Sequence, residues 1–195
     1  MAAVPKKKLS EAEYLVVERR AEYKSEFYRG EMFAMAGAKY EHNRAKDNLA
    51  IALGAKLLGG SCFALTSDMR VKVPASHLYT YPDIVVVCGR PEFEDDVNDT
   101  LLNPLIIIEV LSDSTEKYDR GAKFRLYQPL SSLREYVLVA QDKPVCERFV
   151  RQSDDSWLLT YVVGLEAEFA FATVPVSIPL ATIYSGITFP DEVPR

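Results

Sequence analysis

Residues 105–112 read LIIIEVLS, four apolar residues followed by Glu109 where the pattern would continue with another aliphatic side chain. A continuous apolar run of this kind is typical of a strand that is covered on both faces. A buried carboxylate without a partner is costly or takes up a proton. The sequence therefore predicts a central strand in which Glu109 has either a partner or a use.

The stretches around this strand predict further strands and helices. CFALTSDMRVKV (62–73) and TYPDIVVVCG (80–89) are rich in β-branched residues and end near Pro or Gly, so each indicates a strand. Apolar residues recur at helical spacing over 40–58 and 114–128, and 134–141 indicates one more strand. The order helix, strand, strand, strand, helix, strand predicts an α/β fold in which helices pack against one mixed sheet.

The two ends of the chain predict smaller elements. Ser10 and Glu13 have the spacing of a capping box, which predicts a helix over 10–22. Two short runs that pivot on Arg29-Gly30 predict a hairpin after this helix. Alternating apolar and polar residues toward the C-terminus predict antiparallel strands, and a short helix is expected over 180–185.

Length and composition limit the class of protein. The chain has 195 residues, of which 48% are hydrophobic and 26% are charged, and this is enough to bury one sizeable core. It contains no apolar run near the ~18 residues of a membrane span and no secretory signal. We therefore expect a single domain over residues 1–195 in a cytoplasmic protein without a membrane partner.

Cysteines, histidines and net charge exclude several functions. The three cysteines are widely spaced and each lies in an apolar stretch, which indicates small buried hydrophobes in a reducing compartment. Neither of the two histidines has a partner at zinc-ligand spacing. The net charge of −5 argues against a protein that coats polyanions, so any contact with nucleic acid must be local.

A second acid, Asp83, precedes the apolar run 84–87 in the neighbouring candidate strand. If the two strands are adjacent, Asp83 and Glu109 emerge close together. Mg²⁺ is commonly held by one or two carboxylates together with water and substrate phosphates. Such an ion polarises a phosphoryl oxygen and lowers the pKa of a bound water. The alternative for Glu109 is a structural ion pair with Arg70, Lys72 or Arg120.

Three blocks of the sequence resemble a known family. YPDIVVV (81–87), PLIIIEVLSDSTEKYDRGAKFRLYQ (104–128) and SLREYVLV (132–139) resemble the Uma-two family of endonucleases, a branch of the PD-(D/E)xK restriction-endonuclease-like superfamily. The resemblance covers roughly residues 10–185. It implies a restriction-endonuclease-like α/β core and a divalent metal, Mg²⁺ or Mn²⁺, that is held by Asp83 and Glu109. It also implies hydrolysis of phosphodiester bonds in DNA, and similar proteins lead us to expect a homodimer.

The sequence departs from the superfamily pattern at one position. The lysine that usually stands two residues after the acid is replaced by Leu111, and Lys123 on the following helix matches the position of a migrated lysine. The alternative for Lys123 is a surface ion pair with Asp119, four residues earlier. Lys117, Arg120, Lys123 and Arg125 together form a local basic run that either contacts a phosphate backbone or is simply solvated.

Four further groups have weaker claims to the site. We expect the carbonyl of Val110 to act as a metal ligand beside the two acids. Glu31 matches a family position and is a candidate catalytic acid, with an ordinary hairpin charge as the alternative. His42 is a candidate for phosphate contact or proton transfer, or else a hydrogen-bonding group at a helix end. Asp68 either supports the site or pairs with Arg70.

Three hypotheses follow for function. The leading one is a metal-dependent DNA endonuclease in which Asp83 and Glu109 bind the metal and Lys123 assists the attacking water. The second is a nuclease-fold protein that binds nucleic acid or a protein without cutting, because the usual lysine is missing. The third is a purely structural role for the acids, with the C-terminal strands as an oligomerisation surface.

Overall fold

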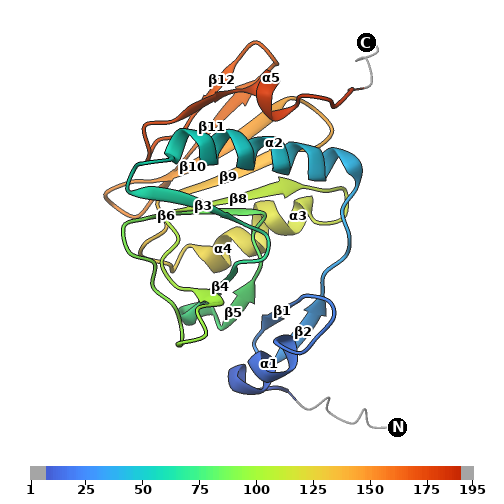
Figure 1. Cartoon of the computed structure of the whole chain (residues 1–195), viewed down its shortest axis with the longest axis vertical. Coiled ribbons are helices and arrows are strands. Elements are labelled where there is room, and N and C mark those ends of the chain that lie inside the picture. Colours follow the sequence, from blue (N-terminus) through green and yellow to red (C-terminus); the bar gives the residue numbers. More distant parts are fainter. Residues whose placement is uncertain (1–7, 190–195) are drawn as a thin grey trace.

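The structure is a computed structural model that describes residues 8–189 (Figure 1). Its helices are α1 (Glu11–Glu18), α2 (Tyr40–Leu57), η1 (Pro74–Ser76, 3-10), α3 (Glu116–Tyr118), η2 (Asp119–Lys123, π), α4 (Phe124–Tyr127) and α5 (Leu180–Ile183). Its strands are β1 (Ser25–Tyr28), β2 (Glu31–Ala34), β3 (Cys62–Thr66), β4 (Arg70–Val73), β5 (Leu78–Thr80), β6 (Ile84–Cys88), β7 (Thr100–Leu101), β8 (Ile106–Leu111), β9 (Glu135–Ala140), β10 (Val145–Arg151), β11 (Trp157–Val163), β12 (Glu168–Ala170) and β13 (Ser177–Pro179).

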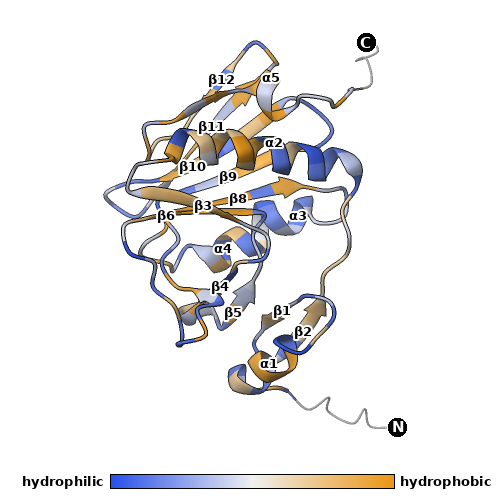
Figure 2. Cartoon of the chain, in the orientation of Figure 1, coloured by the Kyte–Doolittle hydropathy of each residue, from blue (hydrophilic) through white to orange (hydrophobic). Residues whose placement is uncertain are grey.

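A six-stranded mixed sheet forms the centre of the fold, with the strand order β11-β10-β9-β8-β6-β3. Strand β8 pairs antiparallel with β6 and parallel with β9, and all six of its residues are buried. Figure 2 shows hydrophobic colouring along β3, β6 and β8. The predicted central strand is therefore confirmed, and the mixed α+β fold class is confirmed with it.

Both faces of this sheet are covered, which explains why β8 is apolar on both sides. Leu49 and Leu53 of α2 pack with Ile106 and Ile108 on one face. Phe124 and Tyr127 of α4, with Ile107 of β8, belong to the cluster on the other face. Figure 1 shows α2 lying over the sheet, in nearly the same direction as β3 and β8. Odd-numbered and even-numbered residues of β8 therefore face different layers.

The N-terminal helix and hairpin lie at the opposite end of the molecule from β12 and α5 (Figure 1). The predicted capping box at Ser10 and Glu13 is present at the start of α1. In the hairpin turn, Arg29 and Gly30 have φ values of 48° and 94°, which suits a two-residue turn with both central residues left-handed. Strand β1 then pairs with β5, so the hairpin extends a second sheet.

The prediction of a single sheet is wrong. The stretch 62–73 forms two strands, β3 and β4, that are separated by a turn over 67–69 and belong to different sheets. The second sheet has five strands in the order β2-β1-β5-β4-β7. Polar residues of the turn interrupt a run whose β-branched composition is uniform, so composition alone did not separate the two strands. The predicted helix 114–128 is likewise divided into α3, η2 and α4.

The prediction that all three cysteines are reduced is also wrong. Cys62 and Cys88 form a disulfide that joins β3 to β6, with their Cα atoms 3.9 Å apart. The two residues are directly opposed in the antiparallel register of these strands. Their separation of 26 residues gave no sign of this pairing, because contact between them depends on the sheet. Cys146 alone is free and buried, as expected.

Across residues 8–189, no helix combines the length and the apolar character that a membrane span requires. The longest helix, α2, has 18 residues. Charged residues occur along it.

Candidate active site

Asp83 and Glu109 face each other across two neighbouring strands. In the antiparallel register of β6 and β8, Ile84 pairs with Ile108, so Asp83 lies opposite Glu109 one step further on. Directly opposed residues of two paired strands have Cβ atoms about 5 Å apart, and Asp83 immediately precedes the first paired residue of β6. The expectation that the two strands are adjacent is therefore confirmed, and the two acids share one end of the sheet.

One oxygen of Asp83 is held by two groups. Its Oδ2 accepts a hydrogen bond from the Val110 backbone N–H at 2.8 Å and lies 3.3 Å from His42 Nε2. The side chain of Asp83 is only 15% exposed. Among the residues that the structure describes, none donates a hydrogen bond to its other oxygen, Oδ1.

The arrangement at Glu109 is similar. Its Oε1 forms an ion pair with Lys123 Nζ at 2.9 Å and accepts a hydrogen bond from the Tyr127 hydroxyl, also at 2.9 Å. Its Oε2 has no partner within the described part of the chain. The carboxylate is buried, so the pairing with Lys123 offsets part of the cost of removing its charge from water.

The three structural partners that were alternatives for Glu109 form their ion pairs elsewhere. Arg70 pairs with Asp99, Lys72 with Glu11 and Glu94, and Arg120 with Glu116 and Glu147. Lys123 is the partner instead.

Lys123 lies at the centre of a carboxylate cluster. Its Nζ is 2.9 Å from Glu109, 3.2 Å from Glu26 and 3.6 Å from Asp119. The ion pair with Asp119 that was the alternative for Lys123 is present, but both side chains are buried, so its expected place at the surface is wrong. The π-helix η2 carries both Asp119 and Lys123 inward, and π-helical turns are often found at functional sites.

Electrostatics at the cluster reflect an excess of negative charge. Burial raises the pKa of Glu109, and the carboxylates of Asp119 and Asp83 raise it further, although Lys123 opposes them. Burial alone would lower the pKa of Lys123, but the surrounding carboxylates, Glu109 first, raise it well above its ordinary value. One lysine therefore faces several acids, and an added cation would reduce the repulsion among them.

The donor set suits a hard divalent cation. Asp83 Oδ1 and Glu109 Oε2 accept no hydrogen bond from any of the described residues. Because the N–H and C=O groups of a strand residue point toward the same neighbouring strand, the Val110 carbonyl lies on the side of Asp83. Within residues 8–189, no cluster of three or more His, Cys, Asp or Glu side chains forms a metal cage. Two carboxylates with water and phosphate are nevertheless the usual protein complement for Mg²⁺.

The other predicted site residues lie in different surroundings. Glu31 is exposed at the start of β2 and forms no ion pair with any described residue. Asp68 is exposed and pairs with Lys24, so its predicted partner Arg70 is wrong. His42 is buried and its side chain contacts Asp83. The structure thus brings His42 to the two central acids and leaves Glu31 and Asp68 outside the contacts described above.

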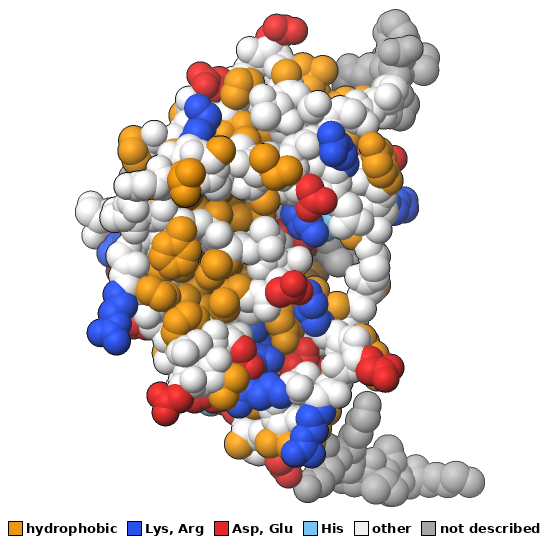
Figure 3. All heavy atoms as spheres, in the orientation of Figure 1, with side chains coloured by type: hydrophobic (Ala, Val, Ile, Leu, Met, Phe, Trp, Pro, Cys, Tyr) orange, Lys and Arg blue, Asp and Glu red, His pale blue; other side chains and the backbone are white. Residues whose placement is uncertain are grey.

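Two of the four residues in the predicted basic run form ion pairs with acidic residues of the same chain. Arg120 bonds Glu116 and Glu147, and Lys123 is buried in the cluster. Lys117 and Arg125 are the two exposed members without an ion pair among the described residues. Figure 3 shows charged side chains of both signs mixed over the lower part of one face, with hydrophobic side chains gathered above them. Attraction of a polyanion would therefore depend on a few residues close to the site.

Sequence reasoning missed Glu26 and Tyr127 as members of the cluster. Glu26 lies on β1 and contacts both Lys123 and the Thr80 hydroxyl, and Tyr127 is fully buried beside Glu109. Nothing in the hairpin pattern distinguishes Glu26 from Glu31, since both are single acids in short strands. The spacing of Lys123 and Tyr127, four residues apart, was the only available signal for the tyrosine, because it places both on one helix face.

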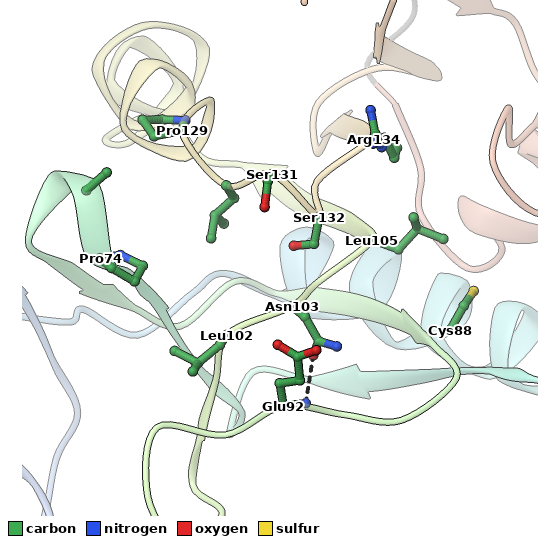
Figure 4. A pocket seen from close by; sticks show the side chains of 12 residues that line it. Pro74, Cys88, Glu92, Leu102, Asn103, Leu105, Pro129, Ser131, Ser132 and Arg134 are labelled. Atoms are coloured by element: carbon green, nitrogen blue, oxygen red, sulfur yellow. Dashed lines mark hydrogen bonds between the residues drawn. The ribbon is translucent and has the colours of Figure 1, made fainter. Parts of the chain in front are cut away.

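A separate pocket of about 700 Å³ opens at the other end of β8, where Leu105 precedes the strand. Figure 4 shows that polar side chains such as Asn103 and Ser132, charged ones such as Glu92 and Arg134, and apolar ones such as Leu102 and Leu105 line it. None of Asp83, Glu109 and Lys123 lines this pocket. The acid cluster is therefore a different site.

The protein has a mixed α+β fold in which two acids lie at neighbouring strands and a lysine of η2 contacts one of them. The sequence matches the Uma2 family, described as "Putative restriction endonuclease", over residues 11–181, and the chain belongs to this family. Two uncharacterized proteins of Synechocystis sp. are 36% and 32% identical to it, over 90% and 96% of this chain and 99% and 97% of their own lengths.

A solved structure has a similar fold. It is a "putative nuclease belonging to DUF820" from Anabaena variabilis, with a TM-score of 0.72 and 15% identity over 89% of this chain and 96% of that one. At this identity the likeness concerns the fold. The family and the fold together support a nuclease function.

Proposed function

We propose that this protein is a divalent-metal-dependent endonuclease that hydrolyses phosphodiester bonds in DNA. The observation that supports this most strongly is the opposition of Asp83 and Glu109 across β6 and β8, with Lys123 Nζ 2.9 Å from Glu109 Oε1. Family membership supplies the reaction class, and the carboxylate pair supplies the reason to propose a metal.

Three groups of the chain are proposed to hold the cation: Asp83, Glu109 and the carbonyl of Val110. A bound Mg²⁺ or Mn²⁺ supplies a polarised phosphoryl oxygen and a water of lowered pKa. Tyr127 fixes Glu109 through its hydroxyl, so the carboxylate keeps one oxygen directed away from the tyrosine. Because Glu109 is buried, bulk water has little access to its carboxylate.

Lys123 is proposed to orient the attacking water and to stabilise charge on the phosphate. This assignment requires its ammonium group to lie beside the metal-binding acid, and its contact with Glu109 meets that requirement. The alternative of a binding protein without activity rested on Leu111 at the usual lysine position. Because Lys123 reaches Glu109 from η2, the replacement at Leu111 does not remove a lysine from the site.

The proposal is tested by cleavage of supercoiled plasmid with Mg²⁺ or Mn²⁺. We expect Asp83→Asn and Glu109→Gln each to lower the rate by about 100-fold or more, since each removes a charge that binds the ion. Lys123→Met should lower the rate at saturating metal. Asp47→Asn, on an exposed part of α2, is the matched control and should cleave normally. Undiminished cleavage by both acid variants would exclude this site.

We further propose that the active form is a homodimer, since two sites are needed to cut both strands of a duplex. Strand β11 is an edge of the larger sheet and exposes Leu158, Tyr161 and Val163. Uncovered apolar edge strands readily pair with another strand. Light scattering of the purified protein should give twice the mass of one chain, and a monomeric mass at assay concentrations would contradict this proposal.

A further inference from the structure

His42 is the buried histidine of the acid cluster, and the proposed reaction does not yet use it. It lies in the first turn of α2 and is 9% exposed. Its Nε2 lies 3.3 Å from Asp83 Oδ2, while its Nδ1 is buried and has no hydrogen-bond partner among the described residues. The contact with Asp83 is thus the polar contact that orients the ring.

The contact determines which oxygen of Asp83 remains available. Oδ2 lies near two donors, the His42 ring and the Val110 backbone N–H. These donors come from different elements, α2 and β8, and together they limit rotation of the carboxylate. Oδ1 is then left as the oxygen of Asp83 that can bind a cation.

A role confined to packing or to the helix end does not explain this geometry. A buried ring nitrogen without a partner destabilises the folded state, and an apolar side chain of similar size would fill the same space without that cost. The Nε2 atom contacts the Asp83 carboxylate and does not cap α2, whose N-cap residue Lys39 has no side-chain capping bond.

We infer that His42 is a positioning residue for the metal site: its Nε2–H holds Asp83 Oδ2 and so directs Oδ1 toward the cation. The inference rests on the proposed function, because it assumes that Asp83 binds a metal. Hydrogen bonds to a ligating carboxylate keep it oriented, and their loss typically weakens metal binding 10- to 100-fold.

Two substitutions separate the polar contact with Asp83 from the space that His42 fills. His42→Met fills a similar volume and has no donor, whereas His42→Gln retains an N–H group at a comparable distance along the side chain. His77→Gln is the matched control, because the side chain of His77 is 62% exposed and pairs with Glu11. Binding of Mn²⁺ alone is measured by calorimetric titration for each variant, and thermal unfolding is recorded without metal.

We expect His42→Met to bind Mn²⁺ about 10- to 100-fold more weakly than wild type. His42→Gln should stay within about threefold, and His77→Gln should match wild type. Wild-type affinity in the methionine variant would overturn the inference. So would equal weakening in the methionine and glutamine variants, or a methionine variant that does not fold, because each indicates a structural histidine.

Asp83→Asn distinguishes failure of this inference from failure of the proposed function. If Asp83→Asn loses Mn²⁺ binding while His42→Met keeps it, the metal site stands and the positioning role is wrong. If Asp83→Asn also binds normally, the proposed metal site itself is wrong.

Discussion

Charge balance around one buried lysine governs the site at the scale of single residues. Lys123 contacts Glu26, Glu109 and Asp119, so its single positive charge is shared among three carboxylates. A buried charge needs such partners, because an isolated one would be neutralised or would destabilise the fold. The glutamate that interrupts the apolar strand β8 is therefore paired, and an excess of acid remains for a cation.

The first prediction compares the two acids of the N-terminal hairpin. Glu26→Gln should lower the metal-dependent cleavage rate by about 10-fold, because it removes a charge that holds Lys123 beside Glu109. Glu31→Gln should cleave at the wild-type rate, because Glu31 is exposed and outside these contacts. Plasmid cleavage at saturating Mn²⁺ measures both. If Glu31→Gln cleaves slowly while Glu26→Gln cleaves normally, this prediction is wrong, and Glu31 is the catalytic acid that the family resemblance implies.

Some of these residues were predictable and others were not. Burial of Glu109 follows from the four apolar residues before it, so its need for a partner could be predicted. The reach of Lys123 could be expected only from the resemblance to a family. Glu26 enters the site through pairing of β1 with β5, a long-range contact that leaves no local pattern in the sequence.

At the scale of elements, the disulfide between Cys62 and Cys88 fastens the edge strand β3 to β6, the strand that follows Asp83. An edge strand is hydrogen-bonded to a neighbour on one side only. A covalent link at such a strand therefore stabilises the part of the sheet that has the fewest backbone hydrogen bonds. The same link connects the end of α2, through the short segment before β3, to the strand that positions the acid.

The second prediction concerns this link. Reduction of the disulfide should lower the free energy of unfolding by about 3.5 kcal/mol, the magnitude that chain entropy gives for a loop closed across 26 residues. Urea unfolding with and without reductant measures the difference. The Cys62→Ser, Cys88→Ser double variant should behave like the reduced protein and should not respond to reductant. Equal stability of the wild type in both conditions would show that the bond does not form.

Element type was more predictable than element boundaries. Periodicity identified α2, β8 and β9 because each is long and has one dominant pattern. The division of 62–73 between two sheets was not predicted, because β3 and β4 have similar composition and differ only in their partners. The π-helical turn η2 was also missed, because a wider turn of only five residues is too short to show a period of its own in the sequence.

At the scale of the whole molecule, a network of ion pairs connects the N-terminal helix to the five-stranded sheet. Arg19 at the end of α1 bonds Asp95 and Asp99, and Asp99 also bonds Arg70 of β4. The hydrogen bond from Arg19 holds the pKa of Asp99 well below its ordinary value. The expectation of one domain over residues 1–195 stays a prediction.

The third prediction follows from this lowered pKa. Asp99 is ionised in the folded state to a lower pH than in the unfolded chain, so its contribution to stability is present above about pH 4. It is lost as the pH falls through the folded-state pKa. Wild type should exceed Asp99→Asn in stability at pH 7, and the difference should shrink toward pH 2. Urea unfolding of both proteins at pH 7, 4.5 and 3 measures this difference in stability. A stability difference that does not change with pH would contradict a lowered pKa of Asp99 in the folded state.

The most direct test of the account is a crystal structure of the protein soaked with Mn²⁺, with the ion located by its anomalous scattering. We predict one strong peak about 2.1 Å from an oxygen of both Asp83 and Glu109, the distance typical of a small hard cation. An ion bound elsewhere, or the absence of any ion between the two acids, would contradict it.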